Sequence, residues 1–282
     1  MNQPFQQITI LGLGLIGGSI ALEAKKHKLA KRVVGYNRSL KSRRSALKRK
    51  ACDAVFGRPE AAVQGSDLVI LATPVKTIPK LAKIIAPHLE KGALVTDVGS
   101  TKAEVVRQLN KILPAEVNFI GGHPIAGTEN SGMDSALLNL FQGRWWIFTP
   151  GTKRNGFNKL RSFARAMGAK VGQMSPREHD ATLAAISHLP HMAAYGLVDT
   201  VLHFRNGKAL QYAAGGFKDY TRIAASSPQM WAEICLDNRS ELLKLIGSFE
   251  RSIGRIKRMV EKQDGSALEK LFETAASNRR KL

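Results

Sequence analysis

The stretch GLGLIGGS at residues 12–19 decides the fold of the amino-terminal half of the chain. An apolar run that predicts a strand precedes it, and a helix-forming stretch follows it. Gly12 would allow the tight turn after the strand, Gly14 would let the backbone approach a phosphate, and Gly17 would let the helix pack closely on the strand. The free N–H groups at the start of such a helix attract a pyrophosphate. This spacing in this context predicts a dinucleotide-binding loop that includes Gly12, Gly14, Leu15, Ile16 and Gly17.

The residues after this loop alternate short β-branched runs with amphipathic stretches. This alternation is typical of a parallel sheet with crossover helices. A helix over residues 157–167, closed by Gly168, precedes the last expected strand. We therefore predict a doubly wound, mostly parallel α/β Rossmann domain over residues 1–174. Its expected strands cover residues 7–11, 32–36, 68–72, 94–98, 118–121, 146–149 and 170–174.

The second half of the chain has the pattern of an all-helical domain. Ser175, Pro176 and Glu178 form a strong helix-start signal, with a capping serine, proline at the first position and glutamate at the third. Residues 179–204 are apolar on several faces, and residues 231–261 repeat apolar side chains at three- and four-residue spacing. One small domain cannot bury so many apolar helices alone. We therefore expect an all-α domain over residues 175–282 that forms a homodimer.

Composition limits the possible partners of the chain. Its 43 Lys and Arg against 22 Asp and Glu give a net charge of +21, which raises the possibility of nucleic-acid binding. The charges are spread through the helical stretches, without a zinc finger, an aromatic RNA-binding signature or a basic tail. We interpret them as a solvated surface and expect no nucleic-acid partner. A basic surface would also attract anionic substrates and coenzymes.

The cellular compartment is inferred from segments that the sequence lacks. No apolar run approaches the roughly 18 residues of a membrane-spanning helix, so we expect no membrane partner. The polar residues 1–7 do not have the pattern of a signal peptide. Cys52 and Cys235 lie far apart without metal-like spacing, which favours a reducing compartment. These features predict a cytoplasmic protein.

The end of the second expected strand bears on the choice of coenzyme. An NAD site would usually have an acidic residue there to hold the ribose hydroxyls, whereas this chain has Asn37, Arg38 and Ser39. Asparagine does not repel a 2′-phosphate, and Arg38 could bind one. These residues favour NADP, with NAD possible if the nearby basic residues are only solvated charges. At another strand end, Thr73 and Pro74 are expected to line the coenzyme site.

A histidine at a strand end is the candidate catalytic base. Ligands of open parallel sheets bind beyond the carboxyl ends of the strands. His123 lies on a glycine-bounded turn after the strand 118–121, where a neutral imidazole could take a hydroxyl proton. Ser100, after a neighbouring strand, could hydrogen-bond the ring and orient it. The alternative is a structural histidine without a catalytic role.

The helical half carries a second group of polar residues. At about 100° per residue, Asp180, His188 and His191 fall within about 80° of one another and form a polar stripe on an otherwise apolar helix. Pro190 should kink this helix and free a carbonyl group near the site. Two histidines and one carboxylate would not exclude a metal, but their spacing lacks the geometry of metalloprotease helices, so we expect none.

One arginine of the helical half is a candidate carboxylate ligand. Arg222 lies in GGFKDYTRIA at residues 215–224, which we expect to be a glycine-started loop joined to a short helix. Its guanidinium suits bidentate recognition of a carboxylate. From spacing alone, an ordinary surface arginine explains the residue equally well.

Taken together, these motifs resemble the prephenate/arogenate dehydrogenase family, over essentially the whole length of the chain. The HPIAG and SHLPH segments distinguish it from hydroxyacid dehydrogenases and pyrroline carboxylate reductases, whose first domains look similar. The motifs are GLGLIGGS at 12–19, DVGSTK at 97–102, GGHPIAGTENSG at 121–132, HDATLAAISHLPH at 179–191 and GGFKDYTRIAASSPQMW at 215–231.

The resemblance implies an active site between a Rossmann domain and a dimerising helical domain. It implies that prephenate or arogenate gives a hydride to NADP or NAD and loses carbon dioxide, on the route to tyrosine. His123 would accept the 4-hydroxyl proton, Arg222 would hold a carboxylate, and Glu129 would pair with the arginine and gate the site. The helical half would add Asp180, His188 and His191 to the substrate-binding residues, with Asp180 supporting the stripe and His191 contacting the substrate side chain.

The resemblance also bears on regulation, and two alternative functions stay open at this point. We expect neither a chorismate mutase before residue 7 nor a regulatory domain after the helical half, so tyrosine feedback would act at the active site. One alternative is a hydroxyacid or imine dehydrogenase, which would rely on a helix-borne lysine instead of His123. The other is a non-catalytic protein that binds nucleotide or nucleic acid, and its binding would be salt-sensitive.

Overall fold

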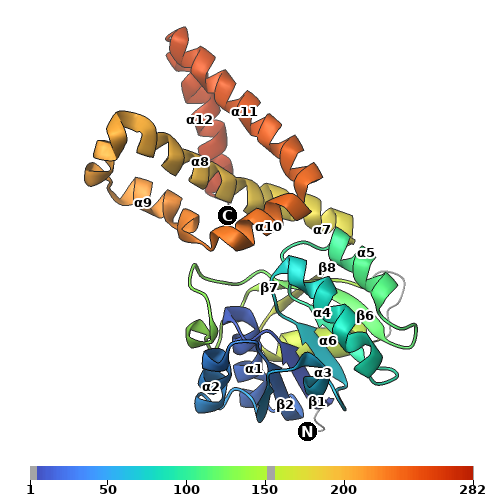
Figure 1. Cartoon of the computed structure of the whole chain (residues 1–282). Helices are drawn as coiled ribbons and strands as arrows, with labels where there is room; N and C mark the ends of the chain where they lie inside the picture. Colours follow the sequence, from blue (N-terminus) through green and yellow to red (C-terminus); the bar gives the residue numbers. More distant parts are fainter. Residues whose placement is uncertain (1–4, 151–155, 282) are drawn as a thin grey trace.

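The computed structural model describes residues 5–150 and 156–281. Figure 1 shows two parts, an α/β part that contains the amino terminus and a helical part that contains the carboxyl terminus. The polar segment 1–7, which we expect not to be a signal peptide, lies partly outside the described residues. The arrangement confirms the predicted fold class, a Rossmann-like sheet followed by helices.

The α/β part is built on one eight-stranded sheet with the order β3-β2-β1-β4-β5-β6-β7-β8. The pairs from β3 to β6 are parallel, β6 and β7 are antiparallel, and β7 and β8 are parallel. The order reverses direction at β1, which places the glycine loop at the switch point of a doubly wound sheet. The strands are β1 (Phe5–Leu11), β2 (Ala30–Tyr36), β3 (Ala54–Phe56), β4 (Leu68–Leu71), β5 (Leu94–Asp97), β6 (Asn118–Pro124), β7 (Trp145–Thr149) and β8 (Lys170–Gln173).

Two of these strands differ from the sequence prediction. The prediction missed β3, which has only three half-buried residues at the edge of the sheet and so lacks a long apolar run. It also ended β6 too early. The strand continues through Gly121 and Gly122 to Pro124, because β7 pairs with this part of it. His123 is therefore a strand residue opposite Ile147 and does not lie on a turn.

Helices cover both faces of the sheet, as crossover connections require. On one face α1 (Leu15–Lys26), α2 (Leu40–Lys48) and α6 (Phe157–Ala166) pack around the fully buried Trp146 and Phe148. On the other face α3 (Pro59–Ala62), α4 (Ile78–Ile85) and α5 (Ala103–Ile112) enclose a second apolar core. Three short 3₁₀ turns, η1 (Val75–Thr77), η2 (Ala86–His88) and η3 (Met133–Ser135), complete this part.

The helical part begins at the predicted capping box. The Ser175 hydroxyl accepts from the Glu178 backbone N–H, and the Glu178 carboxylate accepts from that of Ser175. The elements that follow are α7 (Pro176–Leu183), a π-helical turn η4 (Ala184–His188), α8 (Leu189–His203), η5 (Phe204–Tyr212), α9 (Gly215–Thr221), η6 (Arg222–Ala225), α10 (Pro228–Asp237), α11 (Arg239–Glu261) and α12 (Gly265–Arg279).

Two segments of this part correct the prediction. The stretch 231–261 is two helices, because Asn238 breaks it between α10 and α11. The segment that starts at Gly215 is helical from its first glycine, so it does not begin as the expected loop. The helices leave large apolar side chains exposed, among them Leu243, Ile253 and Phe272. None of the helices in the described part of the chain is long and apolar enough to cross a membrane.

Candidate active site

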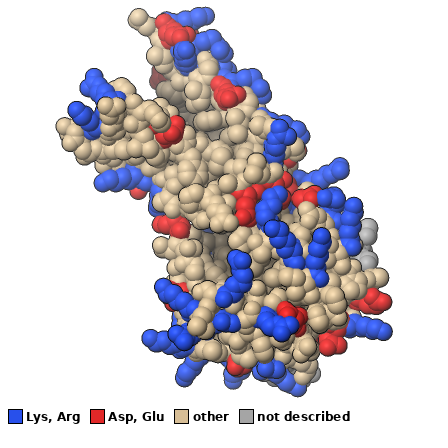
Figure 2. All heavy atoms as spheres, viewed as in Figure 1, with Lys and Arg blue, Asp and Glu red and all other residues tan. Residues whose placement is uncertain are grey.

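A pocket of about 540 Å³ lies between the end of β6, the π-helical turn, and the segment from η6 to α10. Figure 2 shows the face viewed as in Figure 1, with Lys and Arg over both the α/β part and the helical part. Most of the residues proposed from the sequence for catalysis and substrate binding line this pocket. These are Ser100, His123, Glu129, His188, His191 and Arg222.

The His123 ring is held by another histidine at the edge of the pocket. Its Nδ1 lies 2.9 Å from Nε2 of His179, a fully buried residue of α7 that the sequence analysis had not proposed for the site. The orienting partner expected from the sequence was Ser100. Ser100 lines the pocket, but the ring hydrogen bond found in the described part of the chain is the one with His179. Burial and the nearby His179, Lys102 and His188 hold the pKa of His123 well below its usual 6.5, so the ring is neutral near pH 7.

A buried ion pair supports the strand that carries His123. The Lys102 ammonium contacts the Asp97 carboxylate, and both side chains are fully buried. Asp97 also accepts from the backbone N–H of Gly99 at 2.8 Å and of Gly122 at 3.1 Å. A Cβ at Gly122 would lie 2.8 Å from the Asp97 carbonyl oxygen, so only glycine fits this approach. The pair thus ties β5 to the residue before His123.

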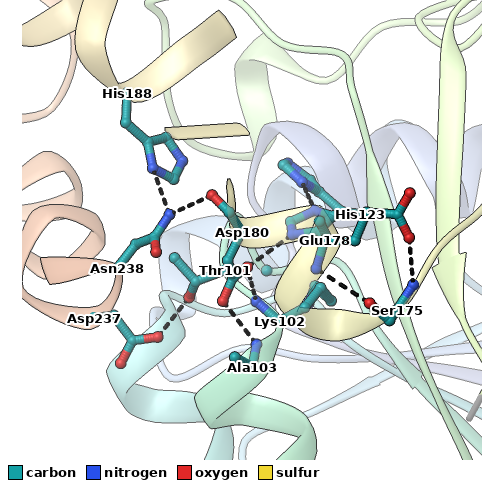
Figure 3. Close-up of polar contacts among 12 residues, drawn as sticks. Thr101, Lys102, Ala103, His123, Ser175, Glu178, Asp180, His188, Asp237 and Asn238 are labelled. Atoms are coloured by element: carbon teal, nitrogen blue, oxygen red, sulfur yellow. Dashed lines mark hydrogen bonds and ion pairs between the residues drawn. The ribbon is translucent and has the colours of Figure 1, made fainter. Parts of the chain in front are cut away.

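Asp180, which was expected to bind the substrate, does not line the pocket. Its carboxylate accepts from the backbone N–H groups of Lys102 and Ala103 at 2.7 and 2.8 Å, at the amino terminus of α5 (Figure 3). It also contacts Nδ1 of His179 at 2.8 Å. The predicted stripe assumed 3.6 residues per turn, whereas the π-helical turn adds a residue between Asp180 and His188. Asp180 therefore faces the α/β part, whereas His188 and His191 face the pocket.

His188 and His191 lie on the pocket side of this turn. His188 is buried, and burial lowers its pKa to about 4. The amide Nδ2 of Asn238 lies 3.2 Å from its Nδ1 and donates to the Asp180 carbonyl oxygen at 2.7 Å, which explains why the helix breaks at Asn238 (Figure 3). The His191 ring stacks on Trp231 with 3.6 Å between ring centroids, and burial lowers its pKa as well. Pro190, in the first turn of α8, follows the π-helical turn.

An arginine and a glutamate face each other at the rim of the pocket. Nη1 of Arg222 lies 3.0 Å from Oε2 of Glu129, and the side chain of Arg222 is 60% exposed. This is the pairing that the family resemblance implied. A second arginine, Arg144 before β7, also lines the pocket. The sequence analysis missed Arg144, because it lies in a polar turn without a recognisable motif.

The glycine loop has the geometry of a phosphate-binding turn. Gly12 has φ +110°, a conformation that favours glycine. A Cβ at Gly14 would meet no heavy atom within 4 Å, so the backbone is open there, and Gly14 caps α1 without a side-chain hydrogen bond. A Cβ at Gly17 would lie 2.0 Å from the Gly12 carbonyl oxygen, which confirms the need for close packing. Beside Gly12, the buried Thr73 hydroxyl has no partner among the described residues, so these groups fit a dinucleotide.

The residues expected to bind the ribose of the coenzyme lie directly after β2. The Asn37 amide donates to the Leu13 carbonyl oxygen at 3.3 Å, and its oxygen accepts from the Ser39 N–H at 2.9 Å. Ser39 caps α2 through its hydroxyl. Arg38 is exposed. Asn37 therefore connects the glycine loop to the start of α2 and leaves Arg38 in solvent.

The fold and the site define a class of protein, the dinucleotide-dependent dehydrogenases. A glycine loop opens a doubly wound sheet, and a neutral histidine and an arginine share a pocket at the carboxyl end of β6. Among the described residues, no group of three or more His, Cys, Asp or Glu is placed to hold a metal ion.

Comparison with known proteins agrees with this class and narrows it. Residues 20–173 match the family model "Prephenate dehydrogenase, nucleotide-binding domain", and residues 175–274 match "Prephenate dehydrogenase, dimerization domain". The chain is 40% identical to the prephenate dehydrogenase of Bacillus subtilis, over 99% of this chain and 76% of that protein.

Two solved structures are similar over nearly the whole chain. The prephenate dehydrogenase of Aquifex aeolicus, in complex with hydroxyphenyl propionate and NAD⁺, has a TM-score of 0.90 and 35% identity, covering 98% of both chains. Synechocystis arogenate dehydrogenase has a TM-score of 0.82 and 28% identity, covering 98% of this chain and 99% of that one. The chain belongs to the prephenate dehydrogenase family, whose members are oxidoreductases.

Proposed function

We propose that the chain oxidatively decarboxylates prephenate or arogenate in tyrosine biosynthesis. One observation carries this proposal: a neutral histidine, His123, shares a pocket with an arginine, Arg222, at the same edge of the sheet as the glycine loop. Each substrate carries a ring hydroxyl and carboxylate groups, so it needs a base at one end and a cation at the other. Relatives named for prephenate and for arogenate support these two compounds as the candidate substrates.

In this proposal, different residues of the pocket bind the substrate and transfer its proton. Arg222 would bind a substrate carboxylate in place of Glu129, with His191 at the side-chain end. Nε2 of His123 would take the proton of the 4-hydroxyl group as hydride leaves C4, with Ser100 beside it in the pocket. The bond from C1 to its carboxylate then breaks and carbon dioxide leaves. The electron pair of this bond completes the aromatic ring, and the C4 oxygen takes its proton back from His123. Buried His188 would form part of the pocket wall.

A nicotinamide coenzyme supplies the hydride acceptor when bound. Gly12, Gly14, Leu15, Ile16 and Gly17 would hold its pyrophosphate against α1, and Thr73 and Pro74 would lie beside it. For the ribose we propose Asn37, Arg38 and Ser39, and a preference for NADP over NAD. The absence of an acidic residue after β2 and the exposed guanidinium of Arg38 support this preference.

We further propose that the chain works as a cytoplasmic homodimer with its domain division at residues 174 and 175. The matched dimerization domain and the exposed apolar side chains of α11 and α12 support the dimer. The capping box at Ser175 supports the division, since it starts the first helix after β8.

A two-by-two assay tests the proposed function. Purified protein is incubated with prephenate or arogenate and with NAD or NADP, and reduced coenzyme is followed spectroscopically. We expect turnover with at least one pair, and a higher specificity constant with NADP. If no pair is turned over while the folded protein still binds coenzyme, the proposed function is wrong.

A further inference from the structure

A chain of three side chains leads from α5 to the pocket. Oδ1 of Asp180 lies 2.8 Å from Nδ1 of His179, and Nε2 of His179 lies 2.9 Å from Nδ1 of His123. His179 is fully buried and Asp180 nearly so. Asp180 contacts neither the pocket nor the expected substrate, so its place in this chain needs another explanation.

The surroundings of Asp180 fix the direction of the first hydrogen bond. Its two carboxylate oxygens accept from the backbone N–H groups of Lys102 and Ala103, the first groups of α5 (Figure 3). Partial positive charge at this helix end favours the ionised carboxylate. An ionised carboxylate only accepts hydrogen bonds, so Nδ1 of His179 must carry the proton between them.

This direction determines the protonation of both rings. A neutral histidine has one N–H, so Nε2 of His179 has a lone pair and accepts from His123. His123 must therefore carry its proton on Nδ1, which leaves a lone pair on Nε2. We infer that Asp180 and His179 are positioning residues that hold His123 in the tautomer whose Nε2 accepts the substrate proton. This inference rests on the proposed function, in which His123 is the base.

Burial, more than the charged groups nearby, keeps both rings neutral until the substrate arrives. Lys102 and Asp97 lie at the start of α5 and the end of β5 and compensate each other, and His188 approaches from the π-helical turn. During the reaction the substrate O–H bond breaks and an Nε2–H bond forms on His123. The resulting imidazolium still donates a hydrogen bond from Nδ1 to Nε2 of His179. Nδ1 of His179 in turn still donates to the Asp180 carboxylate.

The tautomer can be measured directly in the free enzyme. Long-range proton–nitrogen NMR spectra of the full-length protein, labelled in histidine, separate rings protonated at Nδ1 from rings protonated at Nε2. His123→Asn assigns the signals of His123. We expect the Nδ1–H form for His123 and for His179. A spectrum with His123 protonated at Nε2 would overturn the inference, whether or not the enzyme turns over prephenate or arogenate.

Kinetics of a matched pair of variants give the second test. In His179→Gln the group that faces Nδ1 of His123 is no longer fixed as a hydrogen-bond acceptor. The glutamine amide can turn either its oxygen, which accepts, or its NH₂ group, which donates, toward this nitrogen. We expect a mixture of His123 tautomers in the spectrum, and a fall in kcat of about two- to tenfold that matches the lost fraction of the Nδ1–H form, while KM changes by less than about threefold. The control is His203→Gln on the exposed end of α8, which should leave kcat unchanged. Folded His179→Gln with kcat near that of the wild type would contradict the inference. If this variant does not fold, the wild-type spectrum decides.

Discussion

At the level of single residues, the neutral His123 ring determines how the activity should depend on pH. Burial, followed by His179, Lys102 and His188, lowers the pKa of His123 well below 6.5. A base acts in its unprotonated form, and a lowered pKa keeps that form populated at lower pH. We therefore expect kcat/KM to stay constant as the pH falls through 6.5 and to decline only well below it. A pH profile that already halves at 6.5, with the protein still folded, would contradict this assignment.

The candidate site shows which single residues a sequence reveals. His123 and Arg222 lie in motifs whose spacing indicates chemistry, and the structure brings them into one pocket. His179 escaped notice because its role depends on a contact with His123, 56 residues away. Its neighbour Asp180 was assigned to the substrate, whereas its carboxylate caps α5, an element from the other half of the chain.

At the level of elements, helices and strands with a regular sequence pattern were predicted better than the points at which an element breaks or extends. The parallel strands and the capping box follow from local patterns, and the structure has them at nearly the predicted bounds. The extension of β6 and the break at Asn238 depend on partners far away in the sequence. In the second case, the Asn238 side chain bonds the Asp180 carbonyl oxygen. No local pattern contains such tertiary contacts.

The ion pair between Arg222 on η6 and Glu129 after β6 predicts that substitutions of its two residues change the KM for the substrate in opposite directions. Arg222 and Glu129 form an exposed pair, so freeing the arginine requires only about 0.2–1 kcal/mol. Glu129→Gln should therefore lower the KM for the substrate by up to about fivefold. Arg222→Ala should raise it by about tenfold or more, since the carboxylate loses its partner. Steady-state kinetics measure both, and a raised KM in Glu129→Gln would show that the glutamate itself holds the substrate.

The turn between β2 and α2 predicts the choice of coenzyme. An acidic side chain at position 37 would repel a 2′-phosphate, whereas Asn37 does not, and a partly exposed contact with Arg38 would favour NADP by roughly 1–3 kcal/mol. Wild-type enzyme should have a higher kcat/KM with NADP, and Asn37→Asp combined with Arg38→Ala should reverse the order. Preference of the wild type for NAD would mean that Arg38 is only a solvated charge.

At the level of the whole molecule, the helical part should join two copies of the chain. Ile253 on α11 is 50% exposed, and Phe272 on α12 is 51% exposed. Light scattering at micromolar concentration should give the mass of a dimer, and Ile253→Asp should shift it toward the monomer because a charge would be buried. Leu40→Asp, at a site 51% exposed on the α/β part, is the control and should leave the dimer intact. A monomeric wild type would rule out the homodimer.

The central claim is that one site oxidises and decarboxylates the same substrate with His123 as the base. The most direct measurement follows reduced coenzyme and released carbon dioxide together, in wild type and in His123→Asn. We expect equal amounts of both products from prephenate or arogenate, and a loss of about 100-fold or more in both rates for the variant. Reduced coenzyme without carbon dioxide, or a variant as fast as the wild type, would contradict the account.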